Sequence, residues 1–292
     1  MTAVAAPTAV PEARKRGFVR SNPTLVLGIV LLVLIVLVAL LAPWLAPDPG
    51  DASTATHPFN VLKPPSSAHP FGTDLVGRDL LTRVMYGARI SLRIVVEVLL
   101  IAGVIGIPLG LVAGYFRGHV DQVIMRITDI FLAFPALLLS LAIAFVLTPS
   151  VQNMTIAIAV TWWPWYTRLV RGEAASISTR PYIESCRVLG VSHVRILLRH
   201  VLPNSITPVL VQMSMDAGGI LLTAASISFL GLGAQDPTPE WGLIVSQGAQ
   251  YFATQWWFVT FAGLAILFTA IAFNLIGDGI RELLDPRRVI SR

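Results

Sequence analysis

The sequence predicts an all-α integral membrane protein with six transmembrane helices and both termini in the cytoplasm. Only 13% of the residues are charged and the mean hydropathy is +0.74, which fits a lipid-embedded chain better than a water-soluble core. Apolar runs of about 20 residues, the length that crosses the hydrocarbon as a helix, recur along the chain. Basic residues gather beside alternate runs, as the positive-inside rule requires.

The composition also excludes several classes of function. The net charge of +5 is not a nucleic-acid footprint, because the basic residues lie beside apolar runs, where they set topology. The single cysteine, Cys186, excludes a disulfide framework and any cysteine-based zinc or iron–sulfur site. His57 and His69 share one segment, but two histidines are too few to predict a metal site.

Five of the six predicted spans are runs with at most one charged residue. They are Leu25–Ala46, Ile94–Gly114 with Glu97, Ile130–Leu147, Ser205–Leu232 with Asp216, and Trp257–Ile276. The remaining span, Gln152–Gly172, carries Arg168 and Arg171 at its end and is interrupted by Pro164. We include it because it makes the number of spans even and leaves both flanking charge clusters on one side of the membrane.

The chain divides into segments around these spans. Residues 1–20, rich in Ala, Pro and Arg, are predicted to be a disordered cytoplasmic segment. Residues 21–47 form the first span, which is too long for a signal-peptide core and has no clear cleavage site. Residues 48–93 form an extracytoplasmic loop, residues 94–280 the core membrane domain, and residues 281–292 a cytoplasmic tail.

The positive-inside rule sets the orientation. With the N-terminus inside, sixteen of the 21 basic residues fall in cytoplasmic segments. Four of the other five lie within 75–93, where apolar residues recur at helical spacing. These residues are Leu75, Val76, Leu80, Val84 and Ala88. We therefore predict an amphipathic helix that lies on the outer surface and leads into the second span.

A polar, Arg-rich segment, residues 173–204, lies between two apolar runs and is called the elbow below. Pro181 suits the first turn of a helix that Ser178 or Thr179 would cap. Tyr182, Cys186 and Leu189 are spaced to form one apolar face of that helix. Gly190 is predicted to end it in a left-handed conformation.

The second half of the elbow is predicted to be another short helix. Ser192 would cap it, and Arg195 and Arg199 lie one turn apart along it. Pro203 is predicted to separate this helix from the following span. A rigid, basic, two-helix segment between spans suggests a surface for a cytoplasmic partner, although an ordinary basic loop would also satisfy the positive-inside rule.

Several motifs carry a resemblance to a known family. The elbow contains Glu184-Ser185-Cys186, Gly190, Ile196 and Leu202-Pro203. It resembles the loop of binding-protein-dependent ABC importer permeases, in which Glu-Ala-Ala is followed by Gly, Ile and Leu-Pro. The chain is more specifically similar to the second permease subunit of the peptide/nickel group, through motifs spread over about residues 20–288. These motifs are His69-Pro70-Phe71-Gly72-Thr73-Asp74-Leu75-Val76-Gly77-Arg78-Asp79, Arg199-His200-Val201-Leu202-Pro203-Asn204, Ser228-Phe229-Leu230-Gly231-Leu232-Gly233 and Asn274-Leu275-Ile276-Gly277-Asp278-Gly279.

The resemblance implies a type I importer permease fold in a bacterial inner membrane. It also implies a homologous second permease, two ATPase subunits that bind ATP and Mg, and an extracytoplasmic peptide-binding protein. The first helix of the elbow would be the coupling helix that docks on an ATPase subunit. The residues implied in this coupling are Tyr182, Glu184, Ser185, Cys186, Arg187, Gly190, Ile196, Leu202 and Pro203.

The chain itself is not predicted to be an enzyme or to hold a cofactor. A P-loop needs Gly followed directly by Lys, and neither Lys15 nor Lys63 follows a glycine. The energy for transport would therefore come from other subunits. Peptides are the expected substrate, and nickel or glutathione import by the same family is the alternative.

Charged residues within the predicted spans are candidate pathway residues. Glu97 is predicted to pair with Arg93, and Asp129 with Arg126. Asp216 has no other charged residue within sixteen positions. Pathway lining, gating or an intersubunit contact stay open for it beside a plain buried polar contact. Asp236 and Glu240, in the loop Ala234–Trp241, are predicted to be exposed.

A self-sufficient ion-coupled secondary transporter is the rival from another class. It would need coupling carboxylates near the midplane, often repeated in related positions, whereas Asp216 stands alone and no internal repeat is visible. A membrane-embedded enzyme would need a metal or nucleophile constellation that the sequence does not offer.

Overall fold

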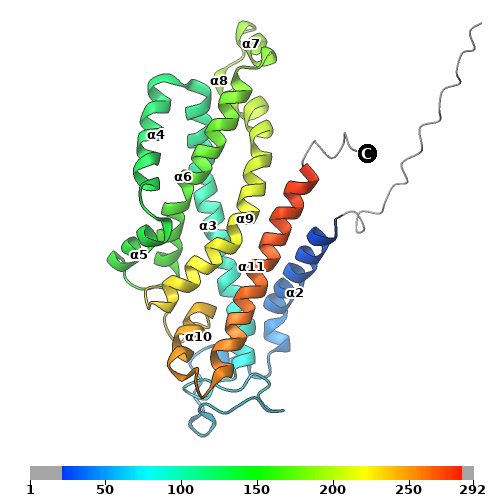
Figure 1. Cartoon of the computed structure of the whole chain (residues 1–292), viewed down its shortest axis with the longest axis vertical. Coiled ribbons are helices and arrows are strands. Elements are labelled where there is room, and N and C mark those ends of the chain that lie inside the picture. The colour runs from blue at the N-terminus through cyan, green and yellow to red at the C-terminus, as the bar shows by residue number, and fades with distance from the viewer. Residues whose placement is uncertain (1–21, 285–292) are drawn as a thin grey trace, which may run out of the picture.

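The computed structural model describes residues 22–284, and most of its long helices run lengthwise along the molecule (Figure 1). Within this range the regular structure is helical, and a single β-bridge joins Thr73 to Asp79. The prediction of an all-α chain is therefore confirmed. The predicted disordered segment 1–20 and most of the predicted tail 281–292 lie outside the described residues, while 281–284 continue the last helix.

Most of the helices follow one another with short connections, and the longest connection is the segment 46–79 between α2 and α3. They are α2 (Pro23–Leu45), α3 (Leu80–Phe116), α4 (Gly118–Leu132), α5 (Ala136–Val146), α6 (Val151–Ser178), α7 (Pro181–Val188), α8 (His193–Ile196), α9 (Leu202–Phe229), α10 (Trp241–Gly248) and α11 (Trp256–Leu284). Short 3₁₀ turns lie at Pro49–Ala52, Pro58–Asn60 and Ala249–Tyr251, and a π turn at Leu197–Val201 joins α8 to α9.

Four helical stretches of the described chain are long and apolar enough to cross a membrane. They are α2, α3, α11 and the stretch His193–Phe229 that contains α9. The pair α4 and α5 would make a fifth span. Our sixth, the segment Gln152–Gly172, is helical within α6 but is not among these stretches. Half of the residues of α6 are buried, because it packs against α3, α5 and α9.

The third predicted span, Ile130–Leu147, is wrong as a single helix. The chain bends by 84° between α4 and α5. Pro135 stands at the bend, immediately before α5. Proline has no N–H for the helical ladder and disfavours the helical conformation of the residue before it, Phe134, so the helix ends there.

The helix predicted to lead into the second span is present, but it is not a separate element on the surface. Residues 80–93 form the first turns of α3 and continue without a break into the span. The carboxylate of Asp79 caps this helix by accepting from the backbone N–H of Thr82 at 2.8 Å. Leu80 and Ala88 of the apolar stripe are buried in protein. Arg78 and Arg83 are buried as well, because carboxylates neutralise them.

These carboxylates tie the predicted outer loop to the segment after α9. Arg78 Nε lies 2.7 Å from Asp74, and Arg78 Nη2 lies 2.8 Å from Asp236. Burial disfavours the charged forms, but the hydrogen bond and the charge of Arg78 outweigh it and lower the pKa of Asp236. The loop 230–240 is therefore held in place by an ion pair that no local sequence pattern indicates.

Glu240 contradicts the prediction of an exposed acidic loop. Its side chain is buried and caps α10 by accepting from the backbone N–H of Gly242 at 3.0 Å and of Leu243 at 2.9 Å. Burial is the largest cause that raises its pKa, against these hydrogen bonds. The carboxylate therefore has a structural role at the start of α10.

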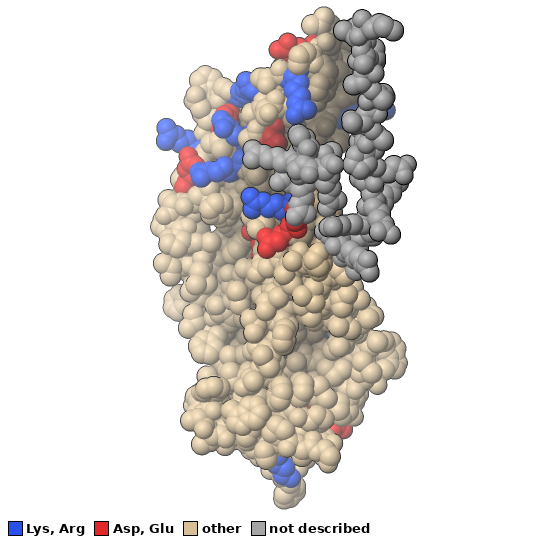
Figure 2. Space-filling model, turned by 45° about the vertical axis from the view of Figure 1, so that its right-hand side comes forward, with Lys and Arg blue, Asp and Glu red and all other residues tan. Residues whose placement is uncertain are grey.

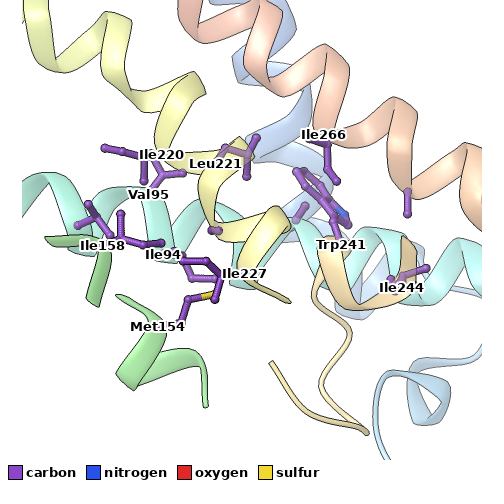
Figure 3. Close-up of a cluster of buried hydrophobic side chains, with 14 of the residues drawn as sticks. Ile94, Val95, Met154, Ile158, Ile220, Leu221, Ile227, Trp241, Ile244 and Ile266 are labelled. Carbon is purple, nitrogen blue, oxygen red and sulfur yellow. The ribbon is translucent and has the colours of Figure 1, made fainter. Parts of the chain in front are cut away.

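The largest buried cluster lies in the half of the molecule that contains α10 and joins α3, α6, α9, α10 and α11, with one alanine each from α2 and α5 (Figure 3). Its members project from α3, α6, α9, α10 and α11 toward a common centre. They include Ile94, Val95, Ile158, Ile220, Ile227, Trp241, Ile244 and Ile266. The Trp241 ring nitrogen donates to the carbonyl of Val84 at 2.9 Å, so this large side chain is buried with its polar atom satisfied.

A line of glycines brings α3 into direct contact with the backbone of α6. Gly106, Gly110 and Gly114 recur every four residues, so they lie on one face of α3. A Cβ added at Gly110 would meet the carbonyl oxygen of Thr167 at 2.6 Å and Cβ of Val170 at 2.7 Å. Small residues at this spacing allow two helices in a membrane to approach closely.

Substitution of Gly110 by Ala should loosen this contact. We expect the free energy of unfolding to fall by about 2 kcal/mol, because the methyl group must displace the backbone of α6. The measurement is the Tm of the purified protein in detergent. Gly263→Ala in α11 is the matched control, since nothing lies within 4 Å of its added Cβ. An equal Tm for the two variants would contradict the contact.

Replacement of Asp236 by Asn should destabilise the outer loop by about 1 kcal/mol at neutral pH, a small value because Asp236 is half exposed. Since its folded pKa is lowered, the stabilisation is complete above the ordinary value of 3.8 and is lost as pH falls through the folded pKa. The Tm difference from wild type should therefore shrink at low pH. Asp48→Asn, at an exposed position, is the control, and a pH-independent difference would contradict the ion pair.

Candidate functional site

The elbow, residues 173–204, forms one end of the molecule, with α7 at its extremity (Figure 1). On the face shown in Figure 2, most charged side chains gather toward this end, and a broad uncharged band separates them from the other end. The helices α3, α6 and α9 support the elbow from below through a buried apolar cluster. This cluster contains Leu111, Tyr115, Val170, Ala174, Ile177, Ile183, Ile196, Val201 and Val209.

Pro181 begins α7, as predicted, but the residue at the cap position is Arg180. Neither Ser178 nor Thr179 caps α7. The hydroxyl of Ser178 donates to the carbonyl of Ala174 at 2.6 Å, and that of Thr179 donates to Ser176 at 2.8 Å. Both hydroxyls thus bond to carbonyls of the last turns of α6 and not to the start of α7.

The apolar face predicted for α7 is wrong. Ile183 is its buried residue, and Cys186 beside it is half-buried. Tyr182 and Leu189 point outward, with Leu189 80% exposed. The i, i+4, i+7 spacing identified a stripe, but Ile183 and Cys186, three residues apart, are the pair that the supporting helices cover.

Gly190 ends α7 in the left-handed conformation that we predicted, with φ of 73°. The N–H of Gly190 donates to the carbonyl of Arg187 and the N–H of Val191 donates to that of Cys186, both at 3.0 Å. This pair of bonds is the Schellman motif, in which apolar residues at the two ends of the longer bond come together. Val191 and Cys186 both pack against the supporting cluster.

The second half of the elbow differs from the prediction. Ser192 precedes α8, but its side chain makes no capping bond, and α8 runs through the π turn into α9. Pro203 does not separate a helix from the span. It lies in the first turn of α9, directly after the π turn, which accommodates the missing N–H. Ile196 is buried, Leu202 is half-buried and Pro203 is exposed.

The outer surface of α7 combines apolar and charged side chains. Val188 is 88% exposed next to Leu189, and the exposed Glu184, Ser185 and Arg187 flank them. Sequence reasoning missed Val188, although two adjacent apolar residues before a helix-ending glycine are an available signal. Two large apolar side chains at the tip of a well-supported helix form a surface suited to a protein groove.

Asp216 lies half-buried on α9, below the elbow. It accepts a hydrogen bond from Gln212 at 2.9 Å, and no ion pair with it occurs in the described part of the chain. Tyr166 of α6 faces it across the helix contact, and the Tyr166 side chain is fully buried. The two side chains form a polar spot inside an otherwise apolar region.

The other charged residues of the spans pair as follows. Glu97 binds Arg93 at 2.7 Å, which confirms the predicted local pair. Asp129 binds Arg168 of α6 at 2.5 Å, so its predicted pairing with Arg126 is wrong. Asp121 binds Arg171 at 2.6 Å. These last two pairs join α4 to α6.

The two histidines of the predicted outer loop have separate carboxylate partners. His57 Nε2 lies 2.8 Å from Asp51, and His69 Nδ1 lies 3.1 Å from Asp79. No group of three or more His, Cys, Asp or Glu residues suited to a metal ion occurs in the described part of the chain.

Comparison with known proteins identifies relatives over nearly the whole chain. Residues 106–290 match the family model of the binding-protein-dependent transport system inner membrane component. Residues 19–65 match the N-terminal TM domain of oligopeptide transport permease C. The chain is 44% identical to the probable D,D-dipeptide transport system permease protein of Escherichia coli, over 92% of this chain and 89% of that protein.

Other relatives extend the range of named substrates. The dipeptide transport system permease protein of Alkalihalophilus pseudofirmus is 41% identical over 92% of this chain and 87% of its own length. The glutathione transport system permease protein of Pectobacterium atrosepticum is 40% identical over 93% and 89%. An inward-facing structure of the MetNI methionine ABC transporter shares the fold at 17% identity, with a TM-score of 0.56 over 70% of this chain and 98% of that one.

Replacement of Gly190 by Val should disrupt the end of α7. A left-handed conformation costs a β-branched residue about 1–2 kcal/mol or more, whereas Asn tolerates it. We expect Gly190→Val to raise the rate of limited proteolysis within 180–200, and Gly190→Asn to stay near the wild-type rate. Nothing lies within 4 Å of a Cβ at this position, so a clash would not explain the difference. Equal rates for Val and Asn would contradict the role of the backbone conformation.

Proposed function

The chain belongs to the family of binding-protein-dependent transport system inner membrane components. We propose that this ABC importer permease subunit takes part in the uptake of peptides. It is a multi-pass inner membrane protein and a non-catalytic subunit. In this proposal it forms half of a pathway for di- or oligopeptides, with a homologous permease as the other half. The observation that carries the proposal is the 44% identity to a dipeptide permease over almost the full length of both chains.

The exposed tip of α7 is the proposed docking point for an ATPase subunit that binds ATP and Mg. Val188 and Leu189 supply apolar contact area, while Glu184 and Arg187 supply charges at its edge. The hydroxyl of Ser185 donates to the carbonyl of Pro181 within α7 at 3.1 Å, so this hydrogen is already used inside the helix. Tyr182 is partly exposed, so it is available to the same partner.

The remaining residues implied in coupling support this tip from inside. Cys186 and Ile196 pack against the cluster below α7, and Leu202 and Pro203 lie where the π turn becomes α9. Gly190 fixes the direction in which the chain leaves α7. A displacement of the α7 tip would therefore be transmitted to α3, α6 and α9 together. A subunit that switches between two states requires such a concerted movement.

The orientation of the chain also belongs to the proposal. The α7 end holds several basic residues that we assigned to the cytoplasm, including Arg117, Arg187, Arg195 and Arg199. A cytoplasmic α7 end favours an extracytoplasmic position for the segment 48–79 and α10, where a peptide-binding protein would deliver its cargo. Asp216 and Tyr166 lie between the two ends, and their polar side chains suit the wall of a passage.

Two other transport functions are retained as alternatives. The 40% identity to a glutathione permease supports glutathione, itself a peptide, as a substrate. Nickel import stands on the sequence resemblance alone. An ion-coupled secondary transporter is disfavoured, since Asp216 is the isolated carboxylate of its region.

The proposal is tested with the full complex in lipid vesicles. A binding protein loaded with a defined mixture of di- to pentapeptides should stimulate ATP hydrolysis and drive peptide uptake. Uptake driven by a proton or sodium gradient with this chain alone would contradict it. Uptake of glutathione or chelated nickel without peptide uptake would favour the alternatives.

Val188→Asp should release the ATPase subunits from this complex. A charge placed in a desolvated apolar contact lacks a partner, so we expect co-purification of the ATPase to fall about tenfold, which corresponds to about 1.4 kcal/mol. Phe59→Asp is the control, because Phe59 is 93% exposed in the segment before α3, far from α7. Similar co-purification with both variants would exclude Val188 from the docking surface.

A further inference from the structure

A cavity of about 410 Å³ lies behind α7, where the ends of α3 and α6 meet α7 and the beginning of α8. Its walls carry a dense set of polar side chains from all four helices. Tyr115 and Arg117 come from the end of α3, Ser178 from the end of α6, Arg187 from α7 and His193 from α8. The cavity is therefore the place where the elbow makes polar contact with the helices below it.

Tyr115 is the residue that joins these elements. It is 5% exposed, one turn after the buried Leu111 on α3. Its hydroxyl lies 2.8 Å from Nδ1 of His193, at the beginning of α8. It also accepts from Nε of Arg187 on α7 at 3.4 Å, and the guanidinium carbon lies 4.8 Å from the centre of the Tyr115 ring. One phenol thus contacts both halves of the elbow.

The chemistry of the three side chains decides which group donates in each hydrogen bond. A guanidinium only donates, so the oxygen of Tyr115 is the acceptor for Arg187. The hydroxyl hydrogen remains free to donate to Nδ1 of His193, which then carries its own hydrogen on Nε2. A chain of donors runs from α7 through α3 to α8. The rings of Phe116 and His193 meet edge to face at the same junction, with their centres 5.7 Å apart.

The contact differs in kind from the apolar packing below it. Ile183 and Ile196 hold the elbow against α3 and α6, but apolar contacts have no preferred direction and tolerate sliding. Hydrogen bonds and a cation over a ring lose their strength when the geometry changes. Tyr115 therefore fixes the position of α7 relative to the end of α3.

We propose that Tyr115 is a positioning residue that transmits the movement of α7 to α3 through Arg187 and His193. The inference rests on the proposed function, in which an ATPase subunit moves α7. Without the phenol hydroxyl, α7 would still pack on its apolar cluster and bind its partner. Its displacement would no longer be passed rigidly to α3, so ATP hydrolysis would proceed with less dependence on the loaded binding protein.

Tyr115→Phe is the variant that tests this step, because it keeps the ring beneath Arg187 and removes only the hydroxyl. The assay uses the assembled importer in lipid vesicles, with and without binding protein loaded with a defined peptide mixture. We expect normal assembly, a threefold to tenfold smaller stimulation of ATP hydrolysis, and less peptide taken up per ATP hydrolysed.

The control is Tyr86→Phe on the same helix. Tyr86 is half-buried near the opposite end of α3 and also lies beside an arginine, with the Arg89 guanidinium carbon 5.9 Å from its ring centre. We expect stimulation within twofold of wild type for Tyr86→Phe. A second pair of variants separates hydrogen bonding from ring packing. His193→Asn keeps a polar atom near the Nδ1 position and should retain more coupling than His193→Ala.

The outcomes distinguish the inference from the proposed function. If wild type shows no stimulation by the loaded binding protein, the proposed function fails and the inference with it. If wild type is stimulated and Tyr115→Phe stays within twofold of Tyr86→Phe, the inference alone is overturned. Equal losses for His193→Asn and His193→Ala, with normal assembly, would likewise overturn the role assigned to the hydrogen bond.

Discussion

The rest of the structure depends on the close contact between α3 and α6. Gly106, Gly110 and Gly114 place no side chain of their own at this contact, and the hydroxyl of Thr167 donates to the carbonyl of Gly106 at 3.1 Å across it. In lipid, where apolar surface gains nothing by leaving the solvent, close packing of this kind is what holds helices together. The contact also fixes the relative height of the two helices, whose ends carry the elbow.

The helices α3 and α6 hold the elbow in place. The chain passes from the end of α6 directly into α7, while the end of α3 contributes Tyr115 to the same junction. The Schellman motif at Gly190 then turns the chain back toward α9, which packs against both α3 and α6. A short helix with two exposed apolar residues is thereby held on three long helices. In a non-catalytic permease subunit, we propose that such a part receives mechanical work from another subunit.

Periodicity and proline positions predicted much of this arrangement, and long-range pairing explains where they failed. Gly190 and Pro181 were predictable because each acts through its own backbone. Arg78 and Arg83 were assigned to a water-exposed surface, since nothing local reveals that Asp74 and Asp236 neutralise them inside the protein. The same limit applies to Asp129, whose partner Arg168 is 39 positions away.

The buried face of α7 could not be chosen from spacing, because both candidate stripes are apolar and only the supporting helices decide between them. The glycine line of α3, by contrast, was visible in the sequence as a repeated four-residue spacing and was overlooked.

The central claim is that α7 is held rigidly as a handle for an ATPase subunit, and site-directed cross-linking tests it most directly. A cysteine placed at Leu189, in a Cys186→Ser background, would carry a short photoreactive or thiol cross-linker in the assembled importer in lipid. The account predicts an efficient cross-link to an ATPase subunit whose yield changes between the ATP-bound and nucleotide-free states. A cysteine at this position that reacts only with reagents added to the extracytoplasmic side, or that never cross-links to an ATPase subunit, would contradict it.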